Sequence, residues 1–156
     1  MKPLLAIGLG NPLMGDDGVG CAVAERLACD PRLPDCAEVI CGGSDLLRYA
    51  AQMEGRKRVV VIDAIQDSAD LGSVSIFEGA SAGPGEPRLD EGQDHVHHLS
   101  AVQAIRLLEI VQSVRCTLCG ISISSVAVGT GLSSALAGRM PAILESVLQE
   151  LGGSPD

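Results

Sequence analysis

The sequence has 156 residues and a hydrophobic fraction of 46%, which predicts a single domain over residues 1–156 with a substantial core. One Phe, one Tyr and no Trp leave almost nothing for stacking nucleobases, and a net charge of −9 disfavours nucleic acid and anionic membranes as partners. The start lacks the length and cleavage site of a signal peptide, and no segment approaches a membrane span, so a cytoplasmic protein is expected.

The first element is an apolar run, residues 4–9, which is typical of a strand buried on both faces of a parallel sheet. A glycine-rich turn follows, and a helix is expected from near Asp16, because apolar residues then recur at three- and four-residue spacing. These residues are Val19, Ala22, Val23 and Leu27. The turn therefore delivers two adjacent acids, Asp16 and Asp17, to the first turn of a helix.

Two interpretations of this acid pair remain open. In the first, Asp16 caps the helix and Asp17 interacts with the positive end of the helix dipole. In the second, capping uses one carboxylate and leaves the other at the carboxyl end of a strand, where open α/β sheets bind ligands. The glycine spacing matches neither G-x-G-x-x-G nor a phosphate loop, and the acids would repel phosphate. A metal cation is therefore the favoured ligand.

Residues 37–41 predict a second strand, after which Gly42-Gly43-Ser44 turns the chain and Ser44 caps a short helix that ends before Gly55. Residues 59–62 are apolar and β-branched, which predicts a buried strand that ends at Asp63.

Asp63 itself has two interpretations. It caps a turn around Asp67 and Ser68, or it belongs to a ligand site. If its strand is parallel and adjacent to the first strand, Asp63 lies at the same sheet edge as Asp17.

The second half of the chain continues the alternation of strands and helices. Residues 74–77 predict a further strand, with an edge position as one possibility, and residues 116–122 predict a fifth. A turn and cap at residues 129–134 lead to a last helix with a clean apolar face, in which Pro141 either kinks the helix or marks where it restarts. The fold class predicted is α/β, a three-layer α-β-α sandwich around a mostly parallel, roughly five-stranded sheet.

A long segment without apolar periodicity, residues 79–94, precedes the three histidines of the chain, His95, His97 and His98. Such loops are usually functional or disordered, and we expect this one to border the cleft. Helical phase places His98 toward one flank and His97 on the stripe that faces the sheet. The other members of that stripe are Ala101, Ala104, Ile105, Leu108 and Val111.

Six cysteines raise the question of a metal cluster or disulfides, but a cytosolic chain with a sufficient core needs neither. Cys116 and Cys119 have CxxC spacing, yet they lie in a predicted strand, where residues three apart point to opposite faces. Packed thiols are therefore expected.

Asp17, Asp63 and His97 come from three segments, and each lies where the chain leaves a strand or enters a helix near one sheet edge. Two carboxylates and an imidazole suit a divalent borderline metal such as nickel or zinc, with coordination positions open for water or substrate. These three residues are the candidate catalytic and metal-binding residues.

Motifs along nearly the whole chain resemble those of the nickel-iron hydrogenase maturation endopeptidases. They are Gly10-Asn11-Pro12-Leu13-Met14-Gly15-Asp16-Asp17-Gly18-Val19-Gly20, Gly42-Gly43-Ser44, Asp63-Ala64, His97 with its helix, and Gly129-Thr130-Gly131-Leu132-Ser133. The resemblance implies a phosphorylase/hydrolase-like sandwich in which Asp17, Asp63 and His97 bind a metal at the cleft. Among the three histidines, His97 is preferred because Leu99, Ser100 and Ala101 fit the family pattern.

The resemblance also implies a reaction and a partner. Members of that family cut a C-terminal extension from the hydrogenase large-subunit precursor after nickel insertion, so the nickel arrives with the substrate, and another divalent metal can substitute for it. A monomer is expected. The family usually has an acid before a Gly-Gly-Thr turn, whereas Cys41 and Ser44 stand here, so a catalytic role for that acid does not carry over.

Neither a serine nor a cysteine has a general base at readable spacing, so metal-assisted hydrolysis is favoured over a covalent protease. Nickel would polarise the scissile carbonyl or activate water, with a neighbouring carboxylate taking the proton. Two rival functions stay open. Residues 8–12 also resemble the opening of peptidyl-tRNA hydrolases, although those continue with a His-Asn pair and need a basic surface, and a nickel-checking chaperone would bind the precursor without cutting it.

Overall fold

The computed structural model describes residues 1–67, 69–79, 101–124 and 126–152. The strands are β1 (Leu4–Gly8), β2 (Ala37–Cys41), β3 (Arg58–Gln66), β4 (Val74–Glu78) and β5 (Arg115–Ile123). The helices are α1 (Val19–Ala28), α2 (Ala50–Met53), α3 (Ala101–Gln112) and α4 (Ser134–Gly152), with two short 3-10 helices, η1 (Gly15–Gly18) and η2 (Leu46–Tyr49). None of the described helices is long and apolar enough to cross a membrane.

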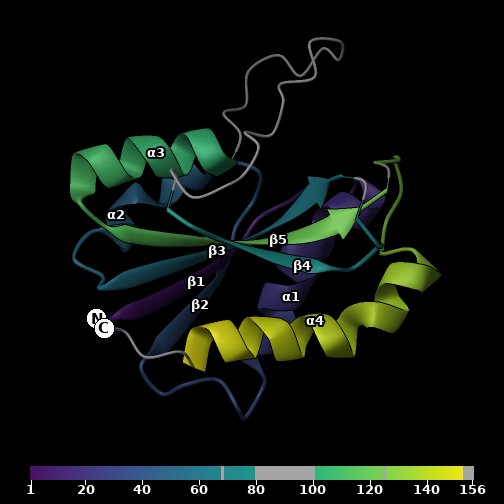
Figure 1. Cartoon of the computed structure of the whole chain (residues 1–156), viewed down its shortest axis with the longest axis horizontal. Helices are drawn as coiled ribbons and strands as arrows, with labels where there is room; N and C mark the ends of the chain where they lie inside the picture. Colours follow the sequence, from purple (N-terminus) through teal and green to yellow (C-terminus); the bar gives the residue numbers. More distant parts are fainter. Residues whose placement is uncertain (68, 80–100, 125, 153–156) are drawn as a thin grey trace.

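The five strands form one sheet in the order β2-β1-β3-β5-β4. The first four are parallel, and β4 pairs antiparallel with β5 at the edge. Figure 1 shows α2 and α3 on one face of the sheet and α1 and α4 on the other. The predicted three-layer α/β sandwich with a mostly parallel sheet is confirmed, as is the edge position considered for residues 74–77.

Each face of the sheet has its own core, because successive strand residues point to opposite sides. In β1, Leu4 and Ala6 pack with α1 and α4, whereas Leu5 and Ile7 pack toward α2 and α3. All four side chains are buried, which explains why the run has no polar alternation. In β5, Cys116 and Cys119 are buried on opposite faces in the same way, so the expectation of packed thiols for this pair is confirmed.

Two glycines allow α1 to start against the strand ends. A Cβ on Gly20 would lie 2.2 Å from the Leu9 carbonyl oxygen and 2.4 Å from the Ile62 carbonyl oxygen, so only glycine fits there. Gly10 has φ of +130°, and a Cβ on it would lie 2.0 Å from the Asp17 carbonyl oxygen. The glycine-rich turn thus allows the backbone around Asp17 to pack closely against the edge of the sheet.

Several local predictions differ from the structure. Asp45, not Ser44, caps the short helix, because its carboxylate accepts a hydrogen bond from the Leu47 N–H at 3.0 Å. Val111 was expected on the buried stripe of α3 but is 69% exposed, because the buried stripe ends at Leu108, one turn before the end of the helix. Pro141 lies inside one continuous helix, so the helix does not restart there.

The strand that carries Asp63 does not end at this acid, contrary to the prediction. β3 continues to Gln66 because β5 pairs with it throughout, from Arg58 opposite Arg115 to Gln66 opposite Ile123. Its other neighbour, β1, stops pairing at Ile62. Tertiary pairing, which a single strand's residues do not report, therefore extends this strand past its apolar run.

Candidate functional site

The unequal lengths of β1 and β3 create a step at the carboxyl edge of the sheet. The Leu9 N–H donates to the Ile62 carbonyl at 2.8 Å, and then the first chain turns away. Asp63, the next residue of β3, is left without a strand on that side. Its neighbours there are the turn after β1 and the start of α1, the location where open α/β sheets bind ligands.

Asp17 comes to this step from η1, the 3-10 helix that precedes α1. Its carboxylate Oδ2 accepts a hydrogen bond from the Asn11 N–H at 2.9 Å, across the glycine-rich turn. Neither Asp17 nor Asp16 caps the helix that it begins. The predicted cap by Asp16 is therefore wrong, whereas Asp17 does lie in the first turn of η1, where it was expected to interact with the helix dipole.

Asp63 is partly buried, and its Oδ1 accepts a hydrogen bond from the Ala64 N–H at 2.8 Å. Asp63 lies inside β3, and Ala64 is the only partner of its carboxylate among the described residues, so the interpretation as a turn cap is wrong here too. Burial raises the pKa of Asp63 to about 7, and the nearby charge of Asp17 adds to this increase. The structure thus brings Asp17 and Asp63 close enough for their charges to interact, with neither carboxylate paired to a cation among the described residues.

Asp16 has a different partner from its neighbour. Its Oδ1 accepts from the Ser133 N–H at 2.7 Å, and its Oδ2 accepts from the Ser133 hydroxyl at 2.9 Å. The same hydroxyl accepts from the Leu136 N–H and so caps α4. A bridge between Met14 and Gly129 joins the same two segments. Asp16 is therefore a structural residue that fastens the loop before α4 beside the Asp17 turn.

Two thiols lie next to the acids, and the spacing of the cysteines in the sequence does not indicate that they form a pair. Cys21 of α1 is buried and donates to the Gly42 carbonyl at 2.7 Å, while Cys41, at the end of β2, lies 3.8 Å from the Cys21 carbonyl oxygen. The pKa of Cys21 is raised to about 12, chiefly by burial, then by its hydrogen bond with Cys41 and by nearby charges that include Asp63. The signal available in the sequence is that β1 and β2 are consecutive parallel strands, which brings their carboxyl ends together.

The third predicted ligand, His97, lies outside the described residues, as do His95, His98 and the segment from residue 80. Within the described part of the chain, no group of three His, Cys, Asp or Glu residues could hold a metal ion. Asp17 Oδ1 and Asp63 Oδ2 accept no hydrogen bond from the described residues. Two free carboxylate oxygens fit part of a site for a divalent cation, and one more ligand is needed to complete it.

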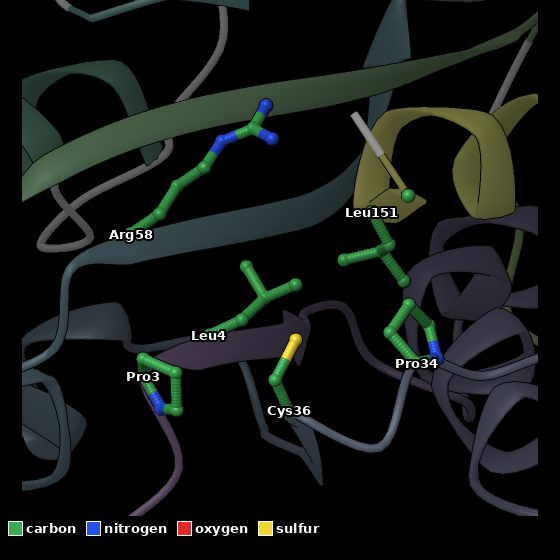
Figure 2. Close-up of a pocket in the computed structure, with 7 residues that line it drawn as sticks. Pro3, Leu4, Pro34, Cys36, Arg58 and Leu151 are labelled. Atoms are coloured by element: carbon green, nitrogen blue, oxygen red, sulfur yellow. The ribbon is translucent and has the colours of Figure 1, made fainter. Parts of the chain in front are cut away.

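A pocket at the opposite, amino edge of the sheet differs from this site, because its buried charge is paired within the fold. Figure 2 shows Pro3, Leu4, Pro34, Cys36, Arg58 and Leu151 around it. Its buried charge, Arg58, is satisfied by hydrogen bonds to the Thr117 hydroxyl at 3.0 and 3.2 Å and by ion pairs with Glu150 and Glu78. This cation links β3 to α4 through Glu150 and to the edge strand β4 through Glu78, and so has a structural role.

Known proteins with similar sequences and folds agree on one family. A putative hydrogenase maturation protease of Methanocaldococcus jannaschii is 39% identical over 75 residues, about half the length of each protein. Hydrogenase 2 maturation protease of Escherichia coli K12 is 25% identical over 151 residues, 95% of this chain and 90% of that protein.

A crystal structure of a NiFe hydrogenase maturation protease, HycI, from Thermococcus kodakarensis KOD1 has a similar fold. The TM-score is 0.74 at 21% identity, with 96% of this chain and 92% of that chain covered. The family model for hydrogenase maturation protease matches residues 21–150. Because this match spans most of the 156 residues, the chain belongs to the hydrogenase maturation protease family.

Proposed function

We propose that this protein is a cytoplasmic endopeptidase that removes the C-terminal extension of a nickel-iron hydrogenase large-subunit precursor after nickel insertion. The observation that carries the proposal is the pair Asp17 and Asp63. Both carboxylates stand at the carboxyl edge of the sheet, each with one oxygen that accepts no hydrogen bond from the described residues. Leaving two acids close together without a cation costs stability, which supports a site that awaits one.

In this proposal the nickel belongs to the substrate. Asp17 and Asp63 would each offer an oxygen to the nickel of a loaded precursor, and His97 would supply the imidazole. This donor set suits a borderline divalent ion and distinguishes a loaded precursor from an empty one. The metal would at the same time position the peptide that is to be cut, since it is fixed to both protein and substrate.

Peptide hydrolysis then requires a water and a proton acceptor near the scissile carbonyl. Substrate-borne nickel supplies Lewis acidity when it is present. The Ser133 hydroxyl donates a hydrogen bond to the Asp16 carboxylate and accepts one from the Leu136 N–H. This is the geometry of a helix cap and not of an activated nucleophile. We therefore infer that water attacks the scissile carbonyl and that a carboxylate at the carboxyl edge of the sheet accepts the proton.

Exposed aliphatic side chains next to the step support a protein substrate. Leu13 is 62% exposed and Val128 is 86% exposed, and the loops that carry them are fastened by hydrogen bonds between Gly129 and both Leu13 and Gly15. Ordered apolar side chains facing solvent are typical of contact surfaces for proteins. We expect the precursor to cover them when its extension enters the site.

The direct test is to incubate nickel-loaded precursor with the purified protein and to weigh the products by mass spectrometry. The expected result is the mature subunit together with the released extension. Precursor without nickel serves as the control and is expected to remain uncut.

The two rival functions give other results. A chaperone would form a complex with loaded precursor without any change in its mass, and a peptidyl-tRNA hydrolase would release peptide from peptidyl-tRNA instead. Equal cutting of loaded and empty precursor would leave the protease but contradict nickel recognition.

A further inference from the structure

We propose that Cys21 and Cys41 form a reversible disulfide beside the carboxyl-edge site, so that the two cysteines act as a redox site. The formation of this bond stands independently of the proposed function. Its effect on precursor processing rests on that function, and the experiment below separates the two.

The first observation is that the two thiols meet although they come from different elements. Cys41 Sγ lies 3.8 Å from the Cys21 carbonyl oxygen, and Cys21 Sγ lies 2.7 Å from the carbonyl oxygen of Gly42, the residue after Cys41. A disulfide needs Cβ atoms roughly 3.5–4.5 Å apart and sulfurs about 2 Å apart. Because each sulfur already contacts the backbone at or next to the other cysteine, side-chain rotation and small backbone shifts can bring the pair to that geometry.

The second observation is that one thiol of the pair is open to solvent while the other is not. Cys41 is exposed, whereas Cys21 is 4% exposed. Such a pair has an entry thiol and a resolving thiol, which is the arrangement that converts a mixed disulfide into an internal one. Cys29 and Cys36 are also exposed, but among the described residues no contact joins either of them to a second, buried cysteine.

The reaction balances with a small-molecule disulfide as the oxidant. The Cys41 sulfur, as thiolate, attacks one sulfur of the oxidant, which breaks the oxidant's S–S bond and releases one thiol. Cys21 then attacks the Cys41 sulfur and releases the second thiol. Two electrons and two protons pass from the pair to the oxidant, and a reducing dithiol reverses both steps.

The disulfide would change the site because of what the Cys21 thiol now holds. It donates to the Gly42 carbonyl at 2.7 Å and lies 3.6 Å from the carbonyl oxygens of Gly8 and Gly10. Oxidation removes that proton and ties α1 to β2. The strand end and the turn that positions Asp17 share these contacts, so both shift when the bond forms.

The test starts with the reduced full-length protein and oxidised glutathione. After acid quenching and alkylation, tryptic peptides are analysed by mass spectrometry. We expect a cross-link between the peptides that contain Cys21 and Cys41, and its loss after treatment with dithiothreitol. The Cys36→Ser variant is the matched control, because Cys36 lies in the same tryptic peptide as Cys41, and it should keep the cross-link. The Cys41→Ser variant should lose it.

Two results would overturn the redox site. One is glutathione that stays on Cys41 without an internal disulfide, and the other is a cross-link that persists in Cys41→Ser. For the effect on function, processing of nickel-loaded precursor by the wild type is expected to fall about tenfold or more on oxidation and to recover on reduction, since displacing reacting groups by about 1 Å costs up to about 100-fold.

The Cys41→Ser variant should process at a rate that glutathione does not alter. Equal processing by oxidised and reduced wild type would overturn the effect on function even if the bond forms. A reduced wild type that forms the disulfide but never cuts precursor would contradict the proposed function and leave the redox site standing.

Discussion

The two edges of the sheet treat buried charge in opposite ways. At the amino edge, Arg58 is 6% exposed and is satisfied by Thr117, Glu150 and Glu78. At the carboxyl edge, Asp63 is partly buried beside Asp17 with no cation paired to either among the described residues. A charge whose partners are all within the fold contributes to structure. A buried charge without a partner in the fold indicates that a ligand or substrate supplies one. The candidate site therefore lies at the carboxyl edge.

The largest expected effect is on processing. Asp17→Asn and Asp63→Asn should each lower the rate of cutting of nickel-loaded precursor on the order of 1,000-fold, equivalent to about 4 kcal/mol of barrier, because an amide keeps the size of the side chain but not its charge. Initial rates by mass spectrometry measure this. Asp35→Asn, at an exposed loop acid, is the control and should cut normally. Normal cutting by either site variant would contradict a functional role for the carboxyl edge.

His97 extends the same test to the ligand outside the described residues. His97→Ala should be as severe as the carboxylate variants, and His98→Ala should be mild, because the helical spacing in the sequence predicts that only His97 faces the sheet. Processing rates of both variants, measured side by side, check this. A severe His98→Ala with a mild His97→Ala would reassign the imidazole ligand.

At the amino edge the expected loss is in stability. Arg58→Met should lower the free energy of unfolding by about 3 kcal/mol, because Glu150 and the Thr117 hydroxyl lose their partner. Urea denaturation measures the change, with Lys57→Met at the exposed neighbouring position as the control. The variant should still process precursor at a temperature where it is folded. Selective loss of processing in folded Arg58→Met would give this edge a functional role.

The carboxyl edge should show the reverse, a gain in stability when its charge is removed. The pKa of Asp63 is about 7 in the folded protein and near 3.8 when unperturbed. The stability that this raised pKa contributes is fully present below about pH 4 and is lost as the pH rises through about 7, since the unfolded state then holds fewer protons than the native state.

Asp63→Asn should therefore be more stable than the wild type at pH 8, on the order of 2 kcal/mol, and the difference should shrink toward pH 4. Denaturation of both proteins across this pH range measures the difference directly. A variant that is less stable than the wild type at pH 8 would mean that Asp63 is structurally satisfied, like Arg58.

A smaller effect is expected where an acid at the carboxyl edge is fully partnered. Ser133→Ala removes the hydroxyl that Asp16 accepts from and that caps α4, so the free energy of unfolding should fall by about 1 kcal/mol. Thermal unfolding measures this, with Ser134→Ala in the first turn of α4 as the control. An unchanged stability would indicate that Asp16 does not fasten this loop.

The sequence by itself predicted much of this protein, because the patterns concerned are local. The unbroken apolar run of β1 and the β-branched start of β3 indicate burial on both faces, which requires helices on two sides of a sheet. Residues 37–41 were predicted as a strand with the bounds that β2 has. The placement of Asp17 and Asp63 at one edge also followed from local order, since each acid comes directly after or near the end of a parallel strand.

Only the tertiary structure decided how each polar group is satisfied, because that depends on contacts between residues far apart in the chain. Asp16 and Asp17 are adjacent residues of the same type. Asp16 accepts hydrogen bonds from Ser133, whereas Asp17 accepts one from the Asn11 N–H. Cys21 and Cys41 meet because β1 and β2 pair in parallel beneath α1, which no spacing of cysteines reports. The pairing of β5 likewise carries β3 beyond Asp63, so that this acid lies inside a strand, where burial raises its pKa although β1 no longer pairs beside it.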